Sequence, residues 1–265
     1  MMKEKAFLTV AVAAALVSAV SATTIQKEKV VCGNCGTENT VTVVGSSNQM
    51  GYSDLDGRPA EMMRSTLKFQ VMECSKCHYC AFDLQEKPQS EAARKIIASP
   101  MPGKTLADRF ARAAEIQAAE AEAPRPAVQF PEIDDSAYAK RNAYFAAGHL
   151  FLRAAWCCDD ANDPERAVAF RRAALKNFES VIALAVKSRE EIKPEFLIML
   201  CDIYRRAGDF ENAKRMADEV LKYKSLPQRM AERQLELCRE KKTDRHTLGE
   251  VRNGEPSASI VVGEE

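Results

Sequence analysis

The sequence predicts an α+β protein that is mostly α, in which a small β module precedes a series of helical hairpins. Short β-prone runs and five of the nine cysteines fall within residues 28–84. Residues 88–122 are rich in Ala and Glu and predict a helical connector, and residues 134–240 carry bulky apolar side chains at helical spacing. The 38 basic and 38 acidic side chains balance. This neutrality argues against broad binding to nucleic acid, which needs a basic surface.

The first 22 residues have the pattern of a secretory signal peptide. Lys3 and Lys5 precede an uncharged, mostly apolar stretch at residues 6–20, and small residues follow up to Ala22. We therefore expect residues 1–22 to be cleaved and the protein to be exported to the periplasm or cell envelope of a bacterium. The alternative is an uncleaved N-terminal anchor, which the length of the stretch disfavours, because a comfortable membrane span needs about 20 apolar residues. We expect no membrane span after cleavage.

The next segment, residues 28–84, is organised around two C-x-x-C pairs. Cys32 and Cys35 form the first pair, and Cys74 and Cys77 form the second, 38 residues later. β-prone runs at 30–31, 40–44 and 67–72 flank them and predict strands. Four thiolates from two adjoining turns can occupy tetrahedral corners, which favours Zn²⁺. Gly36 follows the first pair, where such a turn often needs a positive φ. The pattern predicts a zinc-ribbon-like module.

Other interpretations of these thiols remain open. Export places them in an oxidising compartment, where disulfides form. A Cys₄ cage also accepts iron, which we rank below zinc. A redox C-x-x-C normally opens a helix, whereas a β-prone run follows Cys35. Cys80 or His78 could replace one of the four ligands, or Cys80 could be an extra thiol beside the site.

A polar motif lies between the two cysteine pairs, at Asp54, Asp56 and Arg58. The two carboxylates are candidates for a catalytic pair with an anion-clamping arginine, or for hard-metal ligands. No His or third carboxylate is near in sequence to complete such a site. We therefore favour a structural polar cluster, in which Arg58 pairs with one Asp and braces the loop.

Helix signals become strong after residue 134. Asp163-Pro164, Pro194 and Gly208-Asp209 mark helix starts and a tight turn. Small and large residues at a fixed spacing resemble one tetratricopeptide repeat, with a degenerate repeat upstream. The residues that carry this likeness are Leu197, Cys201, Tyr204, Gly208, Ala213, Ala217 and Pro227. The cysteines of this region are expected to be small core residues, and they are Cys157, Cys158, Cys201 and Cys238. Residues 241–265 are polar and predict a flexible tail.

The segment from Cys32 to Phe82 resembles the bacterial family DUF2225. The likeness rests on the first knuckle with Gly36, on the Asp54–Pro59 stretch, and on the second knuckle followed by Ala81 and Phe82. The chain departs from the family pattern in lacking the knuckle prolines, in His78 where the family has Gly, and in Cys80 where it has Ala. The resemblance implies a continuation into helical repeats and implies no activity.

Together these observations predict a non-catalytic exported protein. A structural Cys₄ zinc site would hold the β module, and the helical repeats would offer a surface to a protein or peptide partner. The alternative is an exported thiol–disulfide or metal-dependent enzyme that uses the C-x-x-C cluster.

Overall fold

The computed structural model describes residues 23–47, 50–123, 135–223 and 228–253. The predicted signal peptide, residues 1–22, lies outside the described residues, and so does the end of the predicted tail. Within the described ranges, no helix is both long enough and apolar enough to cross a membrane.

Two small antiparallel hairpins make up the β structure. Strands β1 (Thr24–Val31) and β2 (Glu38–Ser46) form the longer hairpin, and β3 (Met72–Glu73) and β4 (Cys80–Ala81) form the shorter one. Val31 pairs with Glu38, and Glu73 pairs with Cys80. Each hairpin therefore closes through a six-residue loop, 32–37 or 74–79, and each loop contains one C-x-x-C pair.

The strand expected over residues 67–72 is wrong except at its last residue. Short helix α2 (Glu61–Arg64) and the 3₁₀ turn η1 (Leu67–Phe69) occupy this part of the chain. The amides of Phe69 and Gln70 donate to carbonyls three residues earlier, at 3.0 and 2.9 Å. Leu67 is buried in the core of the helical region. Local turn hydrogen bonds and this distant apolar contact outweigh the alternating pattern.

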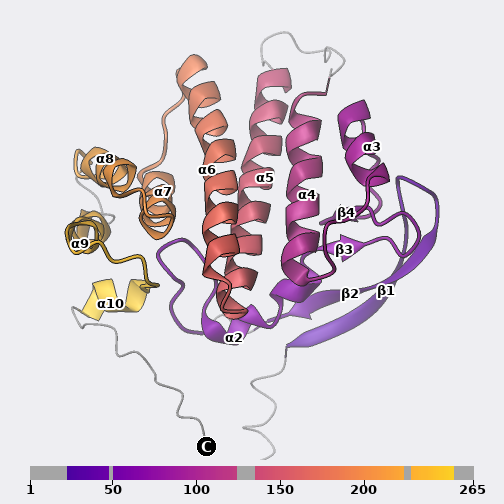
Figure 1. Ribbon diagram of the computed structural model, residues 1–265, viewed down its shortest axis with the longest axis horizontal. Helices are drawn as coiled ribbons and strands as arrows, with labels where there is room; N and C mark the ends of the chain where they lie inside the picture. Colours follow the sequence, from indigo (N-terminus) through magenta and orange to yellow (C-terminus); the bar gives the residue numbers. More distant parts are fainter. Residues whose placement is uncertain (1–22, 48–49, 124–134, 224–227, 254–265) are drawn as a thin grey trace, which may run out of the picture.

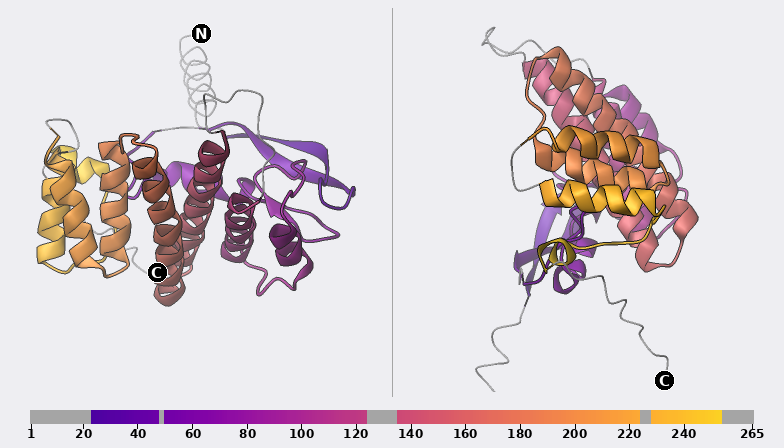
Figure 2. Two further views of the ribbon diagram at one scale, coloured as in Figure 1. Left: turned by 90° about the horizontal axis from the view of Figure 1, so that it is seen from above. Right: turned by 90° about the vertical axis from the view of Figure 1, so that its left-hand side faces the viewer.

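The remaining helices stand side by side in chain order, as Figures 1 and 2 show. Each packs against the next along the chain. They are α3 (Glu91–Ala98), α4 (Leu106–Ala121), α5 (Asp135–Asp160), α6 (Pro164–Lys187), α7 (Pro194–Arg206), α8 (Phe210–Val220), α9 (Gln228–Arg239) and α10 (Leu248–Asn253). The prediction of a mostly α protein with a small β module at its N-terminal side is confirmed. A tetratricopeptide relationship stays a prediction.

Helix boundaries follow the local signals. The Asp163 side chain accepts a hydrogen bond from the Arg166 amide, and Pro164 occupies the first turn of α6. Asp209 caps α8 in the same way, and Gly208 before it has a φ of +81°. Thr105 and Asp108 form a reciprocal capping box at the start of α4.

The predicted connector is part of the core of the β module. One apolar cluster joins Val30 and Tyr79 of the hairpin region to Ile97 of α3 and Ile116 of α4. A second cluster joins α4 to α5 through Phe110 and neighbouring side chains. Two-stranded hairpins bury too little apolar surface to be stable alone. Helices α3 and α4 supply the missing surface and link the hairpins to the row of helices.

The predicted flexible tail is wrong for its described part, residues 241–253. His246 is buried, and its carbonyl accepts a hydrogen bond from the Leu55 amide at 3.0 Å. The Leu248 amide donates to the Ser53 carbonyl at 2.9 Å, immediately at the start of α10. These partners lie almost 200 residues earlier in the chain, so the polar composition of the tail carried no signal of them.

Candidate metal centre

The first cysteine loop is a tight knuckle at the tip of the β1–β2 hairpin. The Cys32 amide donates to the Thr37 carbonyl at 2.9 Å, and the Gly36 amide donates to the Cys32 carbonyl at 2.8 Å. Gly36 has a φ of +74°, as its position after the second cysteine predicts. The Gly33 amide donates to the Leu84 carbonyl at 2.7 Å, which ties this knuckle to the chain leaving β4.

The second loop repeats the geometry of the first. The Cys74 amide donates to the Tyr79 carbonyl at 2.9 Å, and the His78 amide donates to the Cys74 carbonyl at 3.0 Å. His78 has a φ of +56°, so it takes the left-handed conformation of Gly36 without being glycine. Such a conformation costs about 1–2 kcal/mol for a residue with a side chain. The residue after the second cysteine therefore takes a left-handed backbone conformation in both knuckles.

The two knuckles bring their four sulfur atoms together. Cys32 Sγ lies 3.7 Å from Cys77 Sγ, and Cys35 Sγ lies 3.6 Å from Cys74 Sγ. All four atoms lie within 4.8 Å of one another. A tetrahedral ion with metal–sulfur bonds of about 2.3 Å needs sulfur atoms about 3.8 Å apart. A disulfide needs them about 2 Å apart, and all nine cysteines are free thiols. The arrangement can hold one metal ion.

Burial and hydrogen bonding act on these thiols in opposite directions. Burial raises the pKa of Cys32 to about 12 and also raises the pKa of Cys77. Hydrogen bonds with Thr37 lower the pKa of Cys35 to about 6. Burial opposes ionisation of Cys74, but backbone and side-chain hydrogen bonds outweigh it and lower its pKa. A bound cation would favour the thiolate form of all four, because coordinating thiols are deprotonated.

Asn39 on β2 connects the two knuckles, and the sequence analysis missed it. Its side-chain amide nitrogen lies 3.6 Å from Cys74 Sγ and donates to the Thr37 carbonyl at 2.9 Å. Its side-chain oxygen accepts from the amide and the hydroxyl of Ser75, both at 2.9 Å. Asn39 is buried. In the sequence, Asn39 is marked only by its position two residues beyond the first cysteine loop, and its burial and its partners emerge in the fold.

The two alternate candidates lie apart from the sulfur cluster. The His78 ring is exposed and lies 2.8 Å from Glu73 Oε1. Cys80 is buried, and its side chain belongs to the apolar cluster of Phe110 rather than to that of the knuckles. Burial raises the pKa of Cys80 to about 12. Neither belongs to the group of four close ligand atoms.

The cysteines of the helical region are also separate from the four-sulfur group. Cys158, Cys201 and Cys238 are buried, and Cys157 is half-buried. Cys201 donates to the Ala213 carbonyl at 3.0 Å, between α7 and α8.

The motif residues Asp54, Asp56 and Arg58 form a different buried cluster. Asp54 lies on a turn rather than a strand, and its amide donates to the Arg58 carbonyl at 2.9 Å. The three side chains are 1%, 0% and 2% exposed. Arg58 does not pair with an Asp of its own motif, because its guanidinium contacts Asp160 at 2.5 Å.

The two carboxylates of the motif find partners far along the chain. Asp54 pairs with Arg64 at 3.1 Å. Asp56 accepts from Arg206 of α7 and from the Trp156 indole of α5, each at 2.8 Å. Arg206 also pairs with Asp159 at 2.7 Å. The motif thus joins the loop to α5 and α7, and sequence reasoning identified none of these partners.

Comparisons with known proteins identify a family for the chain. The model of a family described as "Uncharacterized protein conserved in bacteria (DUF2225)" matches residues 25–244. The match extends well beyond the cysteine region and takes in the helices from α3 to α9. Neither the curated proteins nor the solved structures contain a match to the chain.

Proposed function

We propose that this chain, which belongs to the DUF2225 family, is a non-catalytic exported protein held together at one end by a structural zinc ion. The observation that carries the proposal is the convergence of Cys32, Cys35, Cys74 and Cys77 within 4.8 Å. Four thiolates fill a tetrahedral shell and leave no open position for a substrate, as in structural zinc sites. The ion would replace the apolar core that two short hairpins lack.

The chemistry of the donor set favours zinc over the other interpretations. All four donors are sulfur, which suits Zn²⁺ and, less often, iron. Both C-x-x-C pairs lie at hairpin tips and not at the start of a helix, where a redox-active pair gains its acidity. A thiol–disulfide or metal-dependent enzyme therefore remains the weaker alternative.

Metal analysis of protein purified from the cell envelope tests the proposal. We expect one zinc per chain, with four thiols becoming reactive only after a chelator is added. Iron would be seen by its visible absorption. Metal-free protein that rapidly reduces a disulfide substrate would support the enzyme alternative and contradict the zinc proposal. Cys80→Ser is the matched control, because that thiol lies outside the cluster and its loss should leave the metal stoichiometry unchanged.

The exported location has its own test. If residues 1–22 are a signal peptide, the mature protein recovered from the periplasm should begin at Thr23, as mass spectrometry of the intact chain can establish. Recovery of chains that still begin at Met1, in the cytoplasmic fraction, would contradict export.

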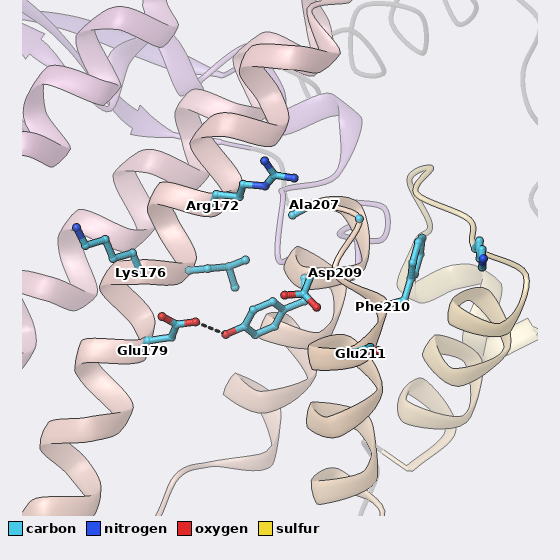
Figure 3. A pocket seen from close by; sticks show the side chains of 11 residues that line it. Arg172, Lys176, Glu179, Ala207, Asp209, Phe210 and Glu211 are labelled. Atoms are coloured by element: carbon cyan, nitrogen blue, oxygen red, sulfur yellow. Dashed lines mark hydrogen bonds between the residues drawn. The ribbon is translucent and has the colours of Figure 1, made fainter.

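We further propose that the helical row binds a protein or peptide. A groove of about 720 Å³ lies between α6 and the α7–α8 turn, and Figure 3 shows Arg172 and Lys176 on one side of it and Asp209 and Phe210 on the other. Arg172 and Lys176 are exposed and make no ion pair with another described side chain. The lining also contains the acidic residues Glu179, Asp209 and Glu211, so an extended peptide with basic, acidic and apolar side chains would match it.

A photocrosslinker in place of Glu211 tests the groove, because Glu211 is an exposed residue of its lining. We expect a discrete adduct in envelope preparations, and we expect Arg172→Glu to abolish it by reversing a lining charge. A crosslinker in place of Glu232, an exposed position of α9 outside the groove, is the control. Equal adducts at both positions would contradict specific binding.

A further inference from the structure

The structure assigns a binding site for a small oxyanion, a phosphate or carboxylate group of a soluble ligand, to a cleft beside the Asp54–Arg58 loop. The cleft has a volume of about 360 Å³. It lies where the end of α5, the turn into α6 and the segment 243–245 meet. Its lining includes the guanidinium groups of Arg58, Arg206 and Arg245. This site is independent of the sulfur cluster and of the groove on α6.

Arg58 supplies a buried cation that is short of partners. Its side chain is 2% exposed, and its only side-chain hydrogen bond to a described residue goes to Asp160 at 2.5 Å. The Nε–H is buried without an acceptor. A guanidinium carries five N–H donors, so most of those on Arg58 remain unused. Burying an unmet donor costs about 1–3 kcal/mol, and an acceptor-rich ligand would recover part of that cost.

Arg206 and Arg245 add donors to the same cleft. The two terminal nitrogens of Arg206 bind Asp56 and Asp159, but its Nε–H is buried without an acceptor. The Arg245 side chain is 44% exposed, and its nearest carboxylate, Asp54, lies 3.9 Å away. Guanidinium groups bind phosphate and carboxylate through paired hydrogen bonds, and Arg245 is free to swing onto such a ligand.

Three of the four carboxylates that line the cleft already have partners. Asp159 is held by Arg206 and by two hydrogen bonds from Arg171. Asp163 caps α6, and Asp160 contacts Arg58. The Asp244 side chain is 61% exposed, and His246 Nε2, 3.1 Å away, makes no hydrogen bond with it. The buried Nε–H groups of Arg58 and Arg206 nevertheless lack an acceptor among the described residues. The oxygen atoms of a carboxylate or a phosphate can accept hydrogen bonds from these groups, whereas a cation would compete with the arginines for the carboxylates that they bind.

Asp160 competes with the ligand for Arg58. Its side chain is 56% exposed although its partner Arg58 is almost wholly buried. An entering oxyanion would take the place of this carboxylate on Arg58, and Asp160 would turn into solvent at little cost. Removing the charge of Asp160 should therefore strengthen binding, which is the opposite of what a merely structural ion pair would show.

Isothermal titration of the full, metal-loaded chain tests the site. We expect saturable binding of inorganic phosphate or acetate, and no saturable heat from sodium chloride at equal ionic strength. Asp160→Asn should lower the dissociation constant about tenfold, and Arg245→Gln should raise it about tenfold or more. Asp218→Asn, at a half-exposed position, and Arg229→Gln, at an exposed one, make the same charge changes outside the cleft and should leave the constant unchanged.

Saturable binding of either probe, with the expected effects of the variants, supports the site. The probe that binds more tightly identifies the ligand group. Two results would overturn the proposal. One is the absence of saturable binding to both the natural chain and Asp160→Asn. The other is a control variant that shifts the dissociation constant as much as the variant with the same charge change in the cleft. Arg245 is half-exposed and Asp160 is at the rim, so both variants should fold, as circular dichroism can verify.

Discussion

Single residues in the knuckles fix how closely the chain segments approach. A Cβ atom on Gly33 would lie 2.5 Å from the Glu86 carbonyl oxygen and 2.6 Å from that of Gln85. Both are backbone atoms, which cannot turn aside as a side chain can. Gly33 is therefore required for packing, while Gly36 is favoured by its left-handed backbone, which His78 adopts in the other knuckle with a side chain.

Gly33→Ala should destabilise the cysteine module by about 1–3 kcal/mol, the usual cost of forcing an atom into a filled site. Urea unfolding, monitored by the release of the metal, would measure this loss of stability. Gly45→Ala is the control, because the nearest atoms to its added Cβ lie 3.7 Å away. Equal destabilisation by the two changes would contradict the packing argument.

Asn39 acts through the residues it holds. Its four polar contacts join Thr37 of one knuckle to Cys74 and Ser75 of the other. We expect Asn39→Ala to weaken zinc binding 10- to 100-fold, roughly the usual effect of losing an outer-shell partner. Competition with a chromophoric chelator would measure the affinity. Thr40→Ala changes an exposed neighbour on the same strand and should have no effect; a comparable loss there would count against the role of Asn39.

At the level of secondary-structure elements, the loop before α2 and the segment before α10 depend on each other. Residues Asp54 and Thr247 form an isolated β-bridge. Asp54 is buried beneath this contact, and burial together with the charge of Asp56 raises its pKa to about 6, against an opposing effect of Arg64. An ordinary Asp has a pKa near 3.8.

The raised pKa of Asp54 predicts a specific pH dependence. Between about pH 4 and pH 6 the folded chain keeps a proton that the unfolded chain has lost, so the contribution of Asp54 to the free energy of unfolding falls as pH rises. The fall is at most about 3 kcal/mol. The Asp54→Asn variant should lack this fall. Its free energy of unfolding, minus that of the natural chain, should therefore increase from about pH 4 to about pH 6. Asp218→Asn should keep the natural slope; a loss of slope there instead would refute the assignment.

At the scale of the whole molecule, the helices form a row in which each contacts its neighbours (Figure 2). Stability in such an arrangement is mostly local, so damage at one end need not spread. The metal site lies at the end of the row that contains α3 and α4 (Figure 1).

Loss of the metal should therefore loosen one end of the molecule. We expect Cys77→Ser to speed amide hydrogen exchange in residues 24–46 and 72–121 and to leave α6–α9 protected. Cys80→Ser makes the same chemical change at a buried cysteine outside the cluster and should retain the metal. Uniform deprotection of the whole chain by Cys77→Ser would show instead that the row unfolds as one unit.

The sequence by itself determined the features that depend on neighbouring residues. The knuckle turns, the positive φ at Gly36, the cap at Asp163 and the turn at Gly208 follow from local chemistry, and so does the amphipathic pattern of the helices. The four metal-ligand candidates could be named because C-x-x-C spacing is itself a local signal. Asn39 could not, because a buried Asn has meaning only once its partner Ser75 is nearby.

Only the tertiary structure decided which distant segments meet. It brought together knuckles separated by 38 residues, joined Asp56 to Trp156 and Arg206, and placed the segment around His246 over the Asp54 loop. It also replaced the expected strand at 67–72 with a turn. A buried carboxylate is stable only beside a partner. Any of the 38 basic side chains could be that partner, and the packing of the helices decides which one it is.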